Sequence, residues 1–414
     1  MRQKYGKLIL AVICFFAVGA AFLPNFKSGV SLGDAANPAP ESISKVATKP
    51  QNSITTPAKL ETTAQSAILM DANGDILFEK DSHKSLPPAS VTKVMTVLLA
   101  VEALERGQVK LEDPVSVSEH AHSMGGSQIW LEVGETMTFG ELLKAVAIAS
   151  ANDAAMAIAE YLGGSEQGFV EMMNKKAVEL GCTDTTFVNP SGLPAAGHMM
   201  SAYDTALIVK YATRYPQYME LVSTKEHWLR DGKTWLLNTN KLLWWYRGAD
   251  GFKTGWTEDA KYCFAGTALR DKLRLIAVVF ATPEPRSHFR EAMKLLDYGF
   301  NTYTGHLVVE KGELIDKVRI FKGTPKEVEV VAAEHLVLTL PKSRTKGIEK
   351  KFIPVEQKLV APIPQGYKVG ELVVYKDGAE LARVNVVTAA EVPKAGFVKI
   401  LQETITELFT FQHK

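Results

Sequence analysis

The 414-residue chain contains little cysteine and carries almost no net charge. Its three cysteines are too few for a disulfide framework, and their spacing matches no metal-binding motif. We therefore expect Cys182 and Cys263 simply to fill space in the fold. The formal net charge is +1, so the chain lacks the basic excess that marks nucleic-acid-binding proteins. These absences argue against a disulfide scaffold and against a nucleic-acid partner.

Several catalytic signatures are missing as well. The chain has no Gly-x-Ser-x-Gly stretch, which excludes hydrolases built on a nucleophile elbow. It has no phosphate-binding loop and no dinucleotide fingerprint. His120 and His122 lie two residues apart, but no acidic or cysteine partners complete a metal site around them, so we interpret both as solvated loop histidines. The sequence predicts neither a metal nor a cofactor.

One long apolar run without a charge, residues 8–23, stands close to the N-terminus behind three basic residues. This arrangement is typical of an export signal, and the run is short for a membrane span. We predict that residues 1–26 form a signal peptide or an N-terminal membrane anchor, with a buried helix as the alternative. Residues 27–60 are rich in Ser, Thr, Ala and Pro and are predicted to form a disordered linker. The protein is therefore expected to be exported.

Residues 61–300 mix strand and helix signals, which favours an α/β or α+β domain. The Asn-Gly pair at 73–74 lies between two β-prone runs and predicts a two-residue hairpin turn with positive φ at both positions. The Ala-rich stretch 139–163 predicts a helix that is buried on most sides. The run 272–282 predicts a buried strand, and 291–300 predicts a closing helix.

The character of the sequence changes after residue 300. Short β-type segments separated by Gly, Pro and Lys predict a small all-β domain over 301–394. Residues 395–414 have one apolar helical face and predict an amphipathic helix. We expect this helix to lie in a membrane interface, with docking on the β domain as the alternative.

Residues 87–96, PPASVTKVMT, contain the first candidate catalytic pair. Apolar residues at helical spacing from Val91 onward predict a helix that begins near Ser90. Ser90 and Lys93 are then i and i+3 on one helix face. A neutral lysine amine can activate a serine hydroxyl, but only about one ordinary lysine in 2500 is neutral at pH 7. Burial and a second cation would have to suppress the charge of Lys93. Taken alone, Ser90 would be read as a helix cap.

Two further short motifs follow. Ser150, Ala151 and Asn152 fall in the Ala-rich stretch, where polar side chains are costly unless they are paired or line a site. Lys253, Thr254 and Gly255 lie in DGFKTGWT, where a cation and a hydroxyl precede a glycine that permits close backbone approach. Each motif alone would most simply be a cap or a turn. Trp244 and Trp245 come shortly before, and we interpret them as core aromatics, with lining of the cleft as the alternative.

The order Ser-x-x-Lys, Ser-x-Asn, Lys-Thr-Gly resembles the signature of the penicillin-recognising serine enzymes. The chain is most similar to the exported serine-type D-alanyl-D-alanine carboxypeptidases, the low-molecular-weight penicillin-binding proteins, over about residues 60 to 414. FVNPSGLP and KLLDYGF also look like stretches of that family. The resemblance implies an α/β (α+β) catalytic domain, a β-sheet with a helical cluster, followed by the small all-β domain and the terminal amphipathic helix. It also implies a location at the outer face of the cytoplasmic membrane or in the periplasm.

The resemblance implies roles for single residues. Ser90 would attack the carbonyl between the two terminal D-alanines of a peptidoglycan stem peptide, and β-lactams would acylate it. Lys93 would be the general base, helped by the nearby Lys253 cation. The other implied roles are proton relay for Ser150, binding of the substrate amide for Asn152, binding of the carboxylate for Lys253 and Thr254, and a backbone oxyanion hole from Ser90 and from Trp256, which follows Gly255.

Two other functions are weighed against this one. A class A β-lactamase shares the three motifs but needs a glutamate for deacylation, and no Glu-x-x-Leu-Asn stretch follows Asn152. The extra β domain and the terminal helix would also be superfluous in such an enzyme. A non-catalytic cell-wall binding scaffold is the second alternative, and the intact set of motifs argues against it.

Overall fold

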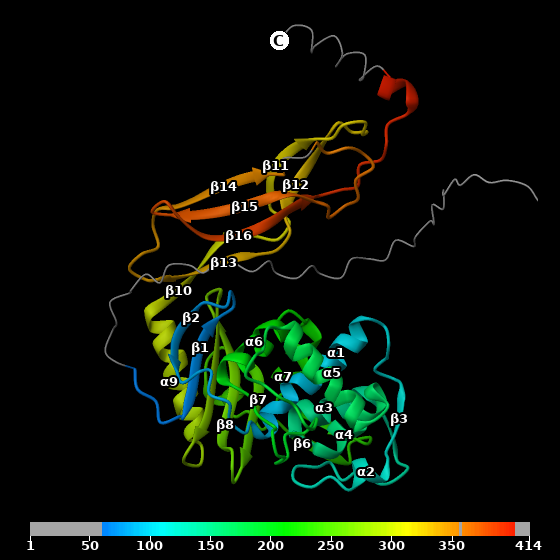
Figure 1. Ribbon diagram of the computed structural model, residues 1–414, viewed down its shortest axis with the longest axis vertical. Coiled ribbons are helices and arrows are strands. Elements are labelled where there is room, and N and C mark those ends of the chain that lie inside the picture. The colour runs from blue at the N-terminus through cyan, green and yellow to red at the C-terminus, as the bar shows by residue number, and fades with distance from the viewer. Residues whose placement is uncertain (1–59, 356–357, 402–414) are drawn as a thin grey trace, which may run out of the picture. The chain divides into compact units, whose positions relative to one another are not determined.

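The computed structural model in Figure 1 describes residues 60–355 and 358–401. The predicted signal segment and almost all of the predicted linker lie outside the described residues. Of the predicted terminal helix, residues 397–401 are helical and the rest lies outside the described part. Within residues 60–355 and 358–401, no helix combines the length and the hydrophobicity needed to cross a membrane.

A five-stranded antiparallel sheet forms the centre of the first domain (Figure 1), in the order β2-β1-β9-β8-β7. The N-terminal hairpin therefore pairs with the last strand of the domain, and β7 is an edge strand. The strands are β1 (Ser66–Asp71), β2 (Ile76–Lys80), β7 (Ala249–Thr257), β8 (Lys261–Arg270) and β9 (Leu273–Thr282). The strand predicted at 272–282 is confirmed as β9.

The central strands are apolar on both faces because helices cover both sides of the sheet. In β1, Ile68 packs into one core cluster and its neighbour Leu69 into another, as the alternation of side chains along a strand requires. Helix α9 (Ser287–Thr302) covers the face of Leu69, with Leu295 fully buried against it. This longer helix contains the one predicted at 291–300.

The opposite face is covered by the helical cluster. Helix α1 lies inside this cluster, and almost all of its residues are buried. The helices of this cluster are α1 (Lys93–Glu105), α2 (Glu119–His122), α3 (Phe139–Lys144), α4 (Asn152–Gly163), α5 (Glu166–Glu179), α6 (Ala202–Ala212), α7 (Pro216–Ser223) and α8 (Leu242–Trp245). Two small two-stranded sheets accompany them. One pairs β3 (Pro114–Ser116) with β4 (Thr136–Thr138), and the other pairs β5 (Glu226–Leu229) with β6 (Thr234–Leu237).

Two local predictions were wrong. The turn between β1 and β2 spans residues 72–75, and of the Asn-Gly pair only Gly74 has a positive φ, +95°. The Asp71 carboxylate accepts hydrogen bonds from the backbone N–H groups of Asn73 (2.9 Å) and Asp75 (2.8 Å) and so favours this wider turn.

The predicted continuous helix 139–163 is also broken. Helix α3 runs into a π-helical turn, η2 (Ala145–Ala149), and Ser150 then adopts φ +65° before α4 begins. The backbone N–H of Asn152 donates to Ser127 O (2.7 Å) and not to a carbonyl of the preceding helix. This tertiary contact overrides the local preference for helix, and π-helical turns of this kind are frequent at functional sites.

The second domain is all-β, as predicted. Its antiparallel five-stranded sheet has the order β11-β12-β16-β15-β14, and β10 pairs with β13 separately. Val330, Val374 and Val386 belong to a core cluster of its own. The strands are β10 (Tyr303–Val309), β11 (Leu314–Arg319), β12 (Glu327–Ala332), β13 (Leu336–Pro341), β14 (Ile348–Pro354), β15 (Lys368–Lys376) and β16 (Ala379–Thr388).

Candidate active site

Ser90 lies in a short 3₁₀ helix, η1 (Ala89–Thr92), that leads directly into α1. The N-cap of η1 is Pro88, and no side chain caps it, so Ser90 does not serve as a side-chain cap. Lys93 begins α1 one turn later, and its Nζ forms a hydrogen bond of 3.0 Å with Ser90 Oγ. The predicted pair on one helix face is therefore present, with the hydroxyl and the amine in direct contact.

Lys93 has the environment of a neutral amine. Its side chain is completely buried, and its Nζ donates to Asn152 Oδ1 (2.6 Å) and to Ser191 O (2.5 Å). Burial and, second, the Lys253 cation hold the pKa of Lys93 well below its usual value, while the Asp153 carboxylate opposes them. A neutral amine has two N–H bonds and one lone pair. With both N–H bonds accepted by carbonyl oxygens, the lone pair is left for the Ser90 hydroxyl.

The roles assigned from the sequence did not include Ser191, which contacts Lys93. It contributes a backbone carbonyl, which has no residue-type signature, although it lies in the FVNPSGLP stretch. The side-chain oxygen of Asn189 accepts hydrogen bonds from the N–H groups of Ser191 (3.1 Å) and Gly192 (2.7 Å) and fixes this turn. A Cβ on Gly192 would lie 1.9 Å from Ala89 O, so only glycine lets the turn approach η1.

The Ser-Ala-Asn motif lies at the break between η2 and α4. Asn152 reaches Lys93 with its side-chain oxygen, and its Nδ2 donates to Gly125 O (2.6 Å). Ser150 is 4% exposed, and within the described part of the chain its Oγ has no hydrogen-bond partner. The backbone of Ser150 lies in the left-handed region, and a hydroxyl without a partner is available to a substrate or to a moving proton.

The Lys-Thr-Gly motif lies on the edge strand β7, which packs beside η1. Lys253 is buried, and burial lowers its pKa to about 7. Its Nζ donates to Thr254 O (3.0 Å), and Thr254 Oγ1 donates to Thr239 Oγ1 (2.9 Å). A Cβ on Gly255 would lie 2.7 Å from Pro88 O, so the close approach predicted for this glycine is present.

Strand β7 thereby brings Lys253 close to η1, the 3₁₀ helix that contains Ser90. Trp256, which follows Gly255 on the same strand, is 55% exposed. A pocket of about 390 Å³ opens next to η1 and is lined by Pro87, Pro88, Ala89, residues 192–199, Thr257 and Asp259. The pocket wall thus includes the neighbours of Ser90, Ser191 and Trp256.

The interpretation of the tryptophan pair as core residues was wrong. Trp244 and Trp245 are 42% and 52% exposed, because the short helix α8 buries Leu242 and Leu243 instead. The ring of Trp245 packs edge-on against Phe289, at 5.4 Å between centroids. Cys182 and Cys263, in contrast, are free and buried, as predicted.

The two histidines lie on the one-turn helix α2 and not in a loop. Nδ1 of His120 lies 3.3 Å from Oε1 of Glu160, and its Nε2 lies 3.7 Å from Oε2 of Glu166. Nδ1 of His122 is hydrogen-bonded to Leu131 O (2.6 Å). The acidic partners come from α4 and the start of α5, which is why the local sequence did not reveal them. No group of three or more His, Cys, Asp and Glu side chains suited to a metal ion is found in residues 60–355 and 358–401.

The fold and the geometry define a class: a serine enzyme of the penicillin-recognising type, in which a serine hydroxyl contacts a buried lysine and a lysine-bearing edge strand lies beside them. The chain belongs to the D-alanyl-D-alanine carboxypeptidase family, whose model matches residues 51–284. The model of the penicillin-binding protein 5 C-terminal domain matches residues 303–394. The enzyme is therefore a D-alanyl-D-alanine carboxypeptidase, and the resemblance noted from the sequence is confirmed.

Individual relatives match either most of the chain or a little over half of it. The D-alanyl-D-alanine carboxypeptidase DacF of Bacillus subtilis (strain 168) is 43% identical, covering 84% of this chain and 91% of the relative. The crystal structure of penicillin-binding protein 5 from Haemophilus influenzae is 31% identical, with a TM-score of 0.67, covering 83% of this chain and 100% of that one. Ampicillin-bound penicillin-binding protein D2 from Listeria monocytogenes is 31% identical, with a TM-score of 0.54, covering 58% of this chain and 99% of that one.

Proposed function

We propose that Ser90 is the nucleophile and Lys93 the general base of a carboxypeptidase that removes the terminal D-alanine from peptidoglycan stem peptides. The observation that carries this proposal is the contact of Lys93 Nζ with Ser90 Oγ (3.0 Å), in which the lysine is fully buried and the serine is partly exposed. A lysine that is neutral at pH 7 can accept the proton of the hydroxyl, which is otherwise a weak nucleophile.

Acylation begins when Lys93 takes the hydroxyl proton and Ser90 Oγ attacks the carbonyl carbon between the two D-alanines. The backbone N–H groups of Ser90 and Trp256 stabilise the oxyanion that develops. The C–N bond then breaks, and the leaving D-alanine nitrogen receives the proton from Lys93, with Ser150 as the relay. The product is an ester on Ser90. Water attacks this ester as Lys93 takes its proton, the ester C–O bond breaks, and Lys93 returns the proton to the serine oxygen.

Substrate binding rests on the edge strand and on α4. The protonated Lys253 and the Thr254 hydroxyl bind the terminal carboxylate, and Asn152 binds the substrate amide. Gly255 keeps the backbone close enough for the peptide to lie along β7. A β-lactam has an amide-like bond and a carboxylate in similar places, so penicillins acylate the same serine. The ampicillin-bound form of the Listeria monocytogenes relative supports this step.

The experiment combines labelling by a fluorescent penicillin with release of D-alanine from a D-Ala-D-Ala peptide. The wild-type chain should be labelled, turn the label over slowly and release D-alanine, and Ser90→Ala should do none of these. Rapid hydrolysis of penicillin would instead indicate a β-lactamase. A chain that neither takes the label nor releases D-alanine would leave only the scaffold function, and both enzymatic proposals would fail.

We also propose the division of the chain and its location. Residues 61–300 form the catalytic unit and 301–394 a separate β domain, with 1–26 and 395–414 as the two candidate membrane attachments of an exported envelope protein. Cell fractionation of the full chain tests this proposal against a variant that ends at residue 394. Recovery of both proteins in the soluble fraction would contradict membrane attachment.

A further inference from the structure

One segment of the active-site rim is bound to the first residues of α4. We call residues 125–131, which have no helix or strand, the rim segment. Asn152 holds it twice, because its Nδ2 donates to Gly125 O (2.6 Å) and its backbone N–H donates to Ser127 O (2.7 Å). The same Asn152 accepts a hydrogen bond from Lys93 through Oδ1. The position of the rim segment therefore affects a direct partner of the proposed base.

Asp153 binds the other half of the rim segment. Its carboxylate accepts hydrogen bonds from the backbone N–H groups of Ile129 (3.1 and 3.2 Å) and Leu131 (3.1 Å), and from that of Ala154 (2.8 Å). Asp153 is completely buried. A buried charge of this kind needs several donors, and two of its three partners are amides of the rim segment.

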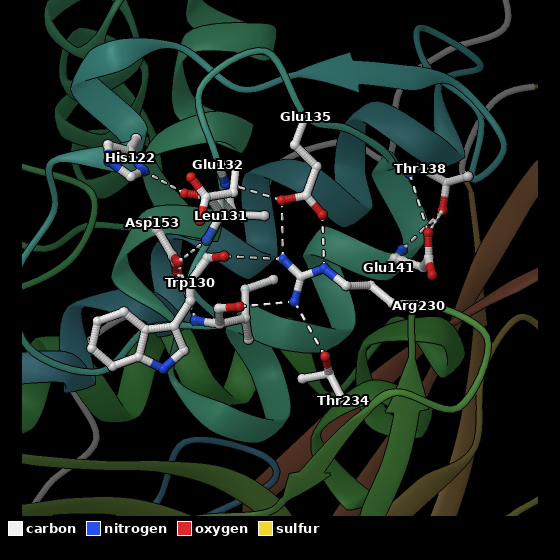
Figure 2. A network of polar contacts seen from close by, with 11 residues as sticks. His122, Trp130, Leu131, Glu132, Glu135, Thr138, Glu141, Asp153, Arg230 and Thr234 are labelled. Atoms are coloured by element: carbon white, nitrogen blue, oxygen red, sulfur yellow. Dashed lines mark hydrogen bonds and ion pairs between the residues drawn. The ribbon is translucent and has the colours of Figure 1, made fainter.

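Arg230, at the tip of the β5–β6 hairpin, holds the rim segment from the opposite side (Figure 2). Its guanidinium donates to Ile129 O (2.8 Å) and to Trp130 O (3.3 Å). It also forms a bidentate ion pair with the carboxylate of Glu135 (2.7 and 3.1 Å). Its last N–H reaches Thr234 Oγ1 (3.2 Å). All five N–H donors of the guanidinium therefore have an acceptor, a geometry that no lysine can reproduce.

The backbone on both sides of this contact is unusual. Trp130 and Arg230 both have left-handed backbone angles, with φ +58° and +51°. Non-glycine residues in this region cost about 1–3 kcal/mol each and persist where the surrounding contacts require them. The contact therefore involves two backbone segments held in strained conformations, which distinguishes it from an ion pair between two flexible surface side chains.

The contact between Arg230 and the rim segment affects the charged groups that surround the Lys93 amine. The charged or titratable groups that face its amine are Lys253 on β7, Asp153 on α4 and His198. Burial and the neighbouring Lys93 lower the pKa of His198 to about 4, so His198 is neutral at pH 7. Asp153 is therefore the anion that favours a protonated Lys93. Its amide partners, and the nearby positive charge of Arg230, weaken that influence.

We propose that Arg230 is a positioning residue for acylation. With Glu135, it holds the rim segment against the start of α4, and this keeps Lys93 in its basic form. Without Arg230, the amides of the rim segment would leave the Asp153 carboxylate, whose charge would then stabilise protonated Lys93. The inference rests on the proposed roles of Ser90 and Lys93.

The test is the pH profile of acylation by a fluorescent penicillin, measured as a second-order rate with the full chain. In Arg230→Met, the acid midpoint should move to higher pH, and each unit of that movement lowers the rate on the acid limb about tenfold. Glu135→Gln should shift the midpoint in the same direction by less, because the backbone carbonyls still hold the guanidinium. Arg230→Lys should fall between wild type and Arg230→Met, and it serves as the test if Arg230→Met does not fold.

Arg383→Met is the matched control. Arg383 pairs with Glu380 through two nitrogens and with Glu371 through a third, but it lies in the β domain. Its pH profile should equal that of the wild type. A wild-type acid midpoint in both Arg230 variants, or a loss of rate that is equal at every pH, would overturn the proposal, because either result marks Arg230 as merely structural. Failure of wild-type labelling would instead contradict the role of Ser90.

Discussion

The two domains differ in what they bury. The catalytic domain has Lys93, Asp153 and Lys253 in its interior, whereas in the described part of the β domain Thr388 is the only buried polar side chain. The ionic groups of the β domain, such as Arg383, lie on the surface. Burying a charged group costs several kcal/mol unless it is well paired. The difference teaches that, in the described residues, costly buried charges are concentrated in the catalytic domain, whereas the interior of the β domain is almost entirely apolar.

The largest expected effect comes from removing the proposed base, which tests whether a buried charge of the catalytic domain serves the reaction. Lys93→Met should lower the acylation rate by about 10²- to 10⁴-fold, the usual contribution of a general base. The measurement is the second-order rate of labelling by fluorescent penicillin. Near-normal labelling of this variant would show that the buried amine is not the base.

Lys176 offers a control for buried lysines in general. It is also buried, but it pairs with Glu102 (3.0 Å) and Glu179 (2.8 Å), and hydrogen bonds to these carboxylates raise its pKa despite burial. Lys176→Met should therefore lower the midpoint of urea unfolding and leave the acylation rate unchanged. The two variants together separate a buried lysine that serves chemistry from one that serves the fold.

The second prediction concerns pH and Lys253. This side chain must be protonated to bind a carboxylate, and burial lowers its pKa to about 7. In the free enzyme, kcat/KM for a D-Ala-D-Ala peptide should therefore fall about tenfold per pH unit above that pKa. In Lys253→Arg, the cation persists at all accessible pH values, so the alkaline fall should disappear even if the maximal rate is lower. An unchanged alkaline limb in this variant would assign it to another group.

The third prediction compares two glycines that differ only in their surroundings. Gly192 and Gly197 both have φ +81°, but a Cβ on Gly192 would lie 1.9 Å from Ala89 O, whereas the space around Gly197 is open. Gly197→Ala should lose about 1–2 kcal/mol of unfolding free energy from its backbone angle. Gly192→Ala should lose more and should also slow acylation, because Ala89 precedes Ser90. Equal effects in urea unfolding and labelling would show that the packing against η1 is unimportant.

Local pattern was enough to predict that a helix begins near Ser90 and that Ser90 and Lys93 lie on the same side, because spacing along a helix determines which side chains share a face. It was also enough for β9, whose apolar residues are buried on both faces. The placement of Lys253 beside Lys93 came from the family resemblance. No local pattern fixes it, since it depends on the pairing of β7 with β8 and the packing of β7 against η1.

The features that the sequence concealed have in common that they depend on tertiary contacts. The helix breaks at Ser150 because Ser127 O binds the N–H of Asn152, although the Ala-rich sequence favours a continuous helix. Ser191 acts through a carbonyl that every residue has. Arg230 lies about 100 residues from the segment it holds, and nothing in its neighbourhood in the sequence indicates that contact.

The smallest expected effect is that of a surface ion pair in the β domain. It tests the contrast between the exposed charges of this domain and the buried charges of the catalytic domain. Arg383 is 51% exposed and pairs with Glu371 and Glu380. Exposed pairs contribute about 0–1 kcal/mol, because water screens them and the side chains lose entropy. Arg383→Met should therefore change unfolding free energy by less than about 1 kcal/mol and leave D-alanine release unchanged. A larger loss in urea unfolding would show that the β domain depends on its surface ion pairs and not on its valine core alone.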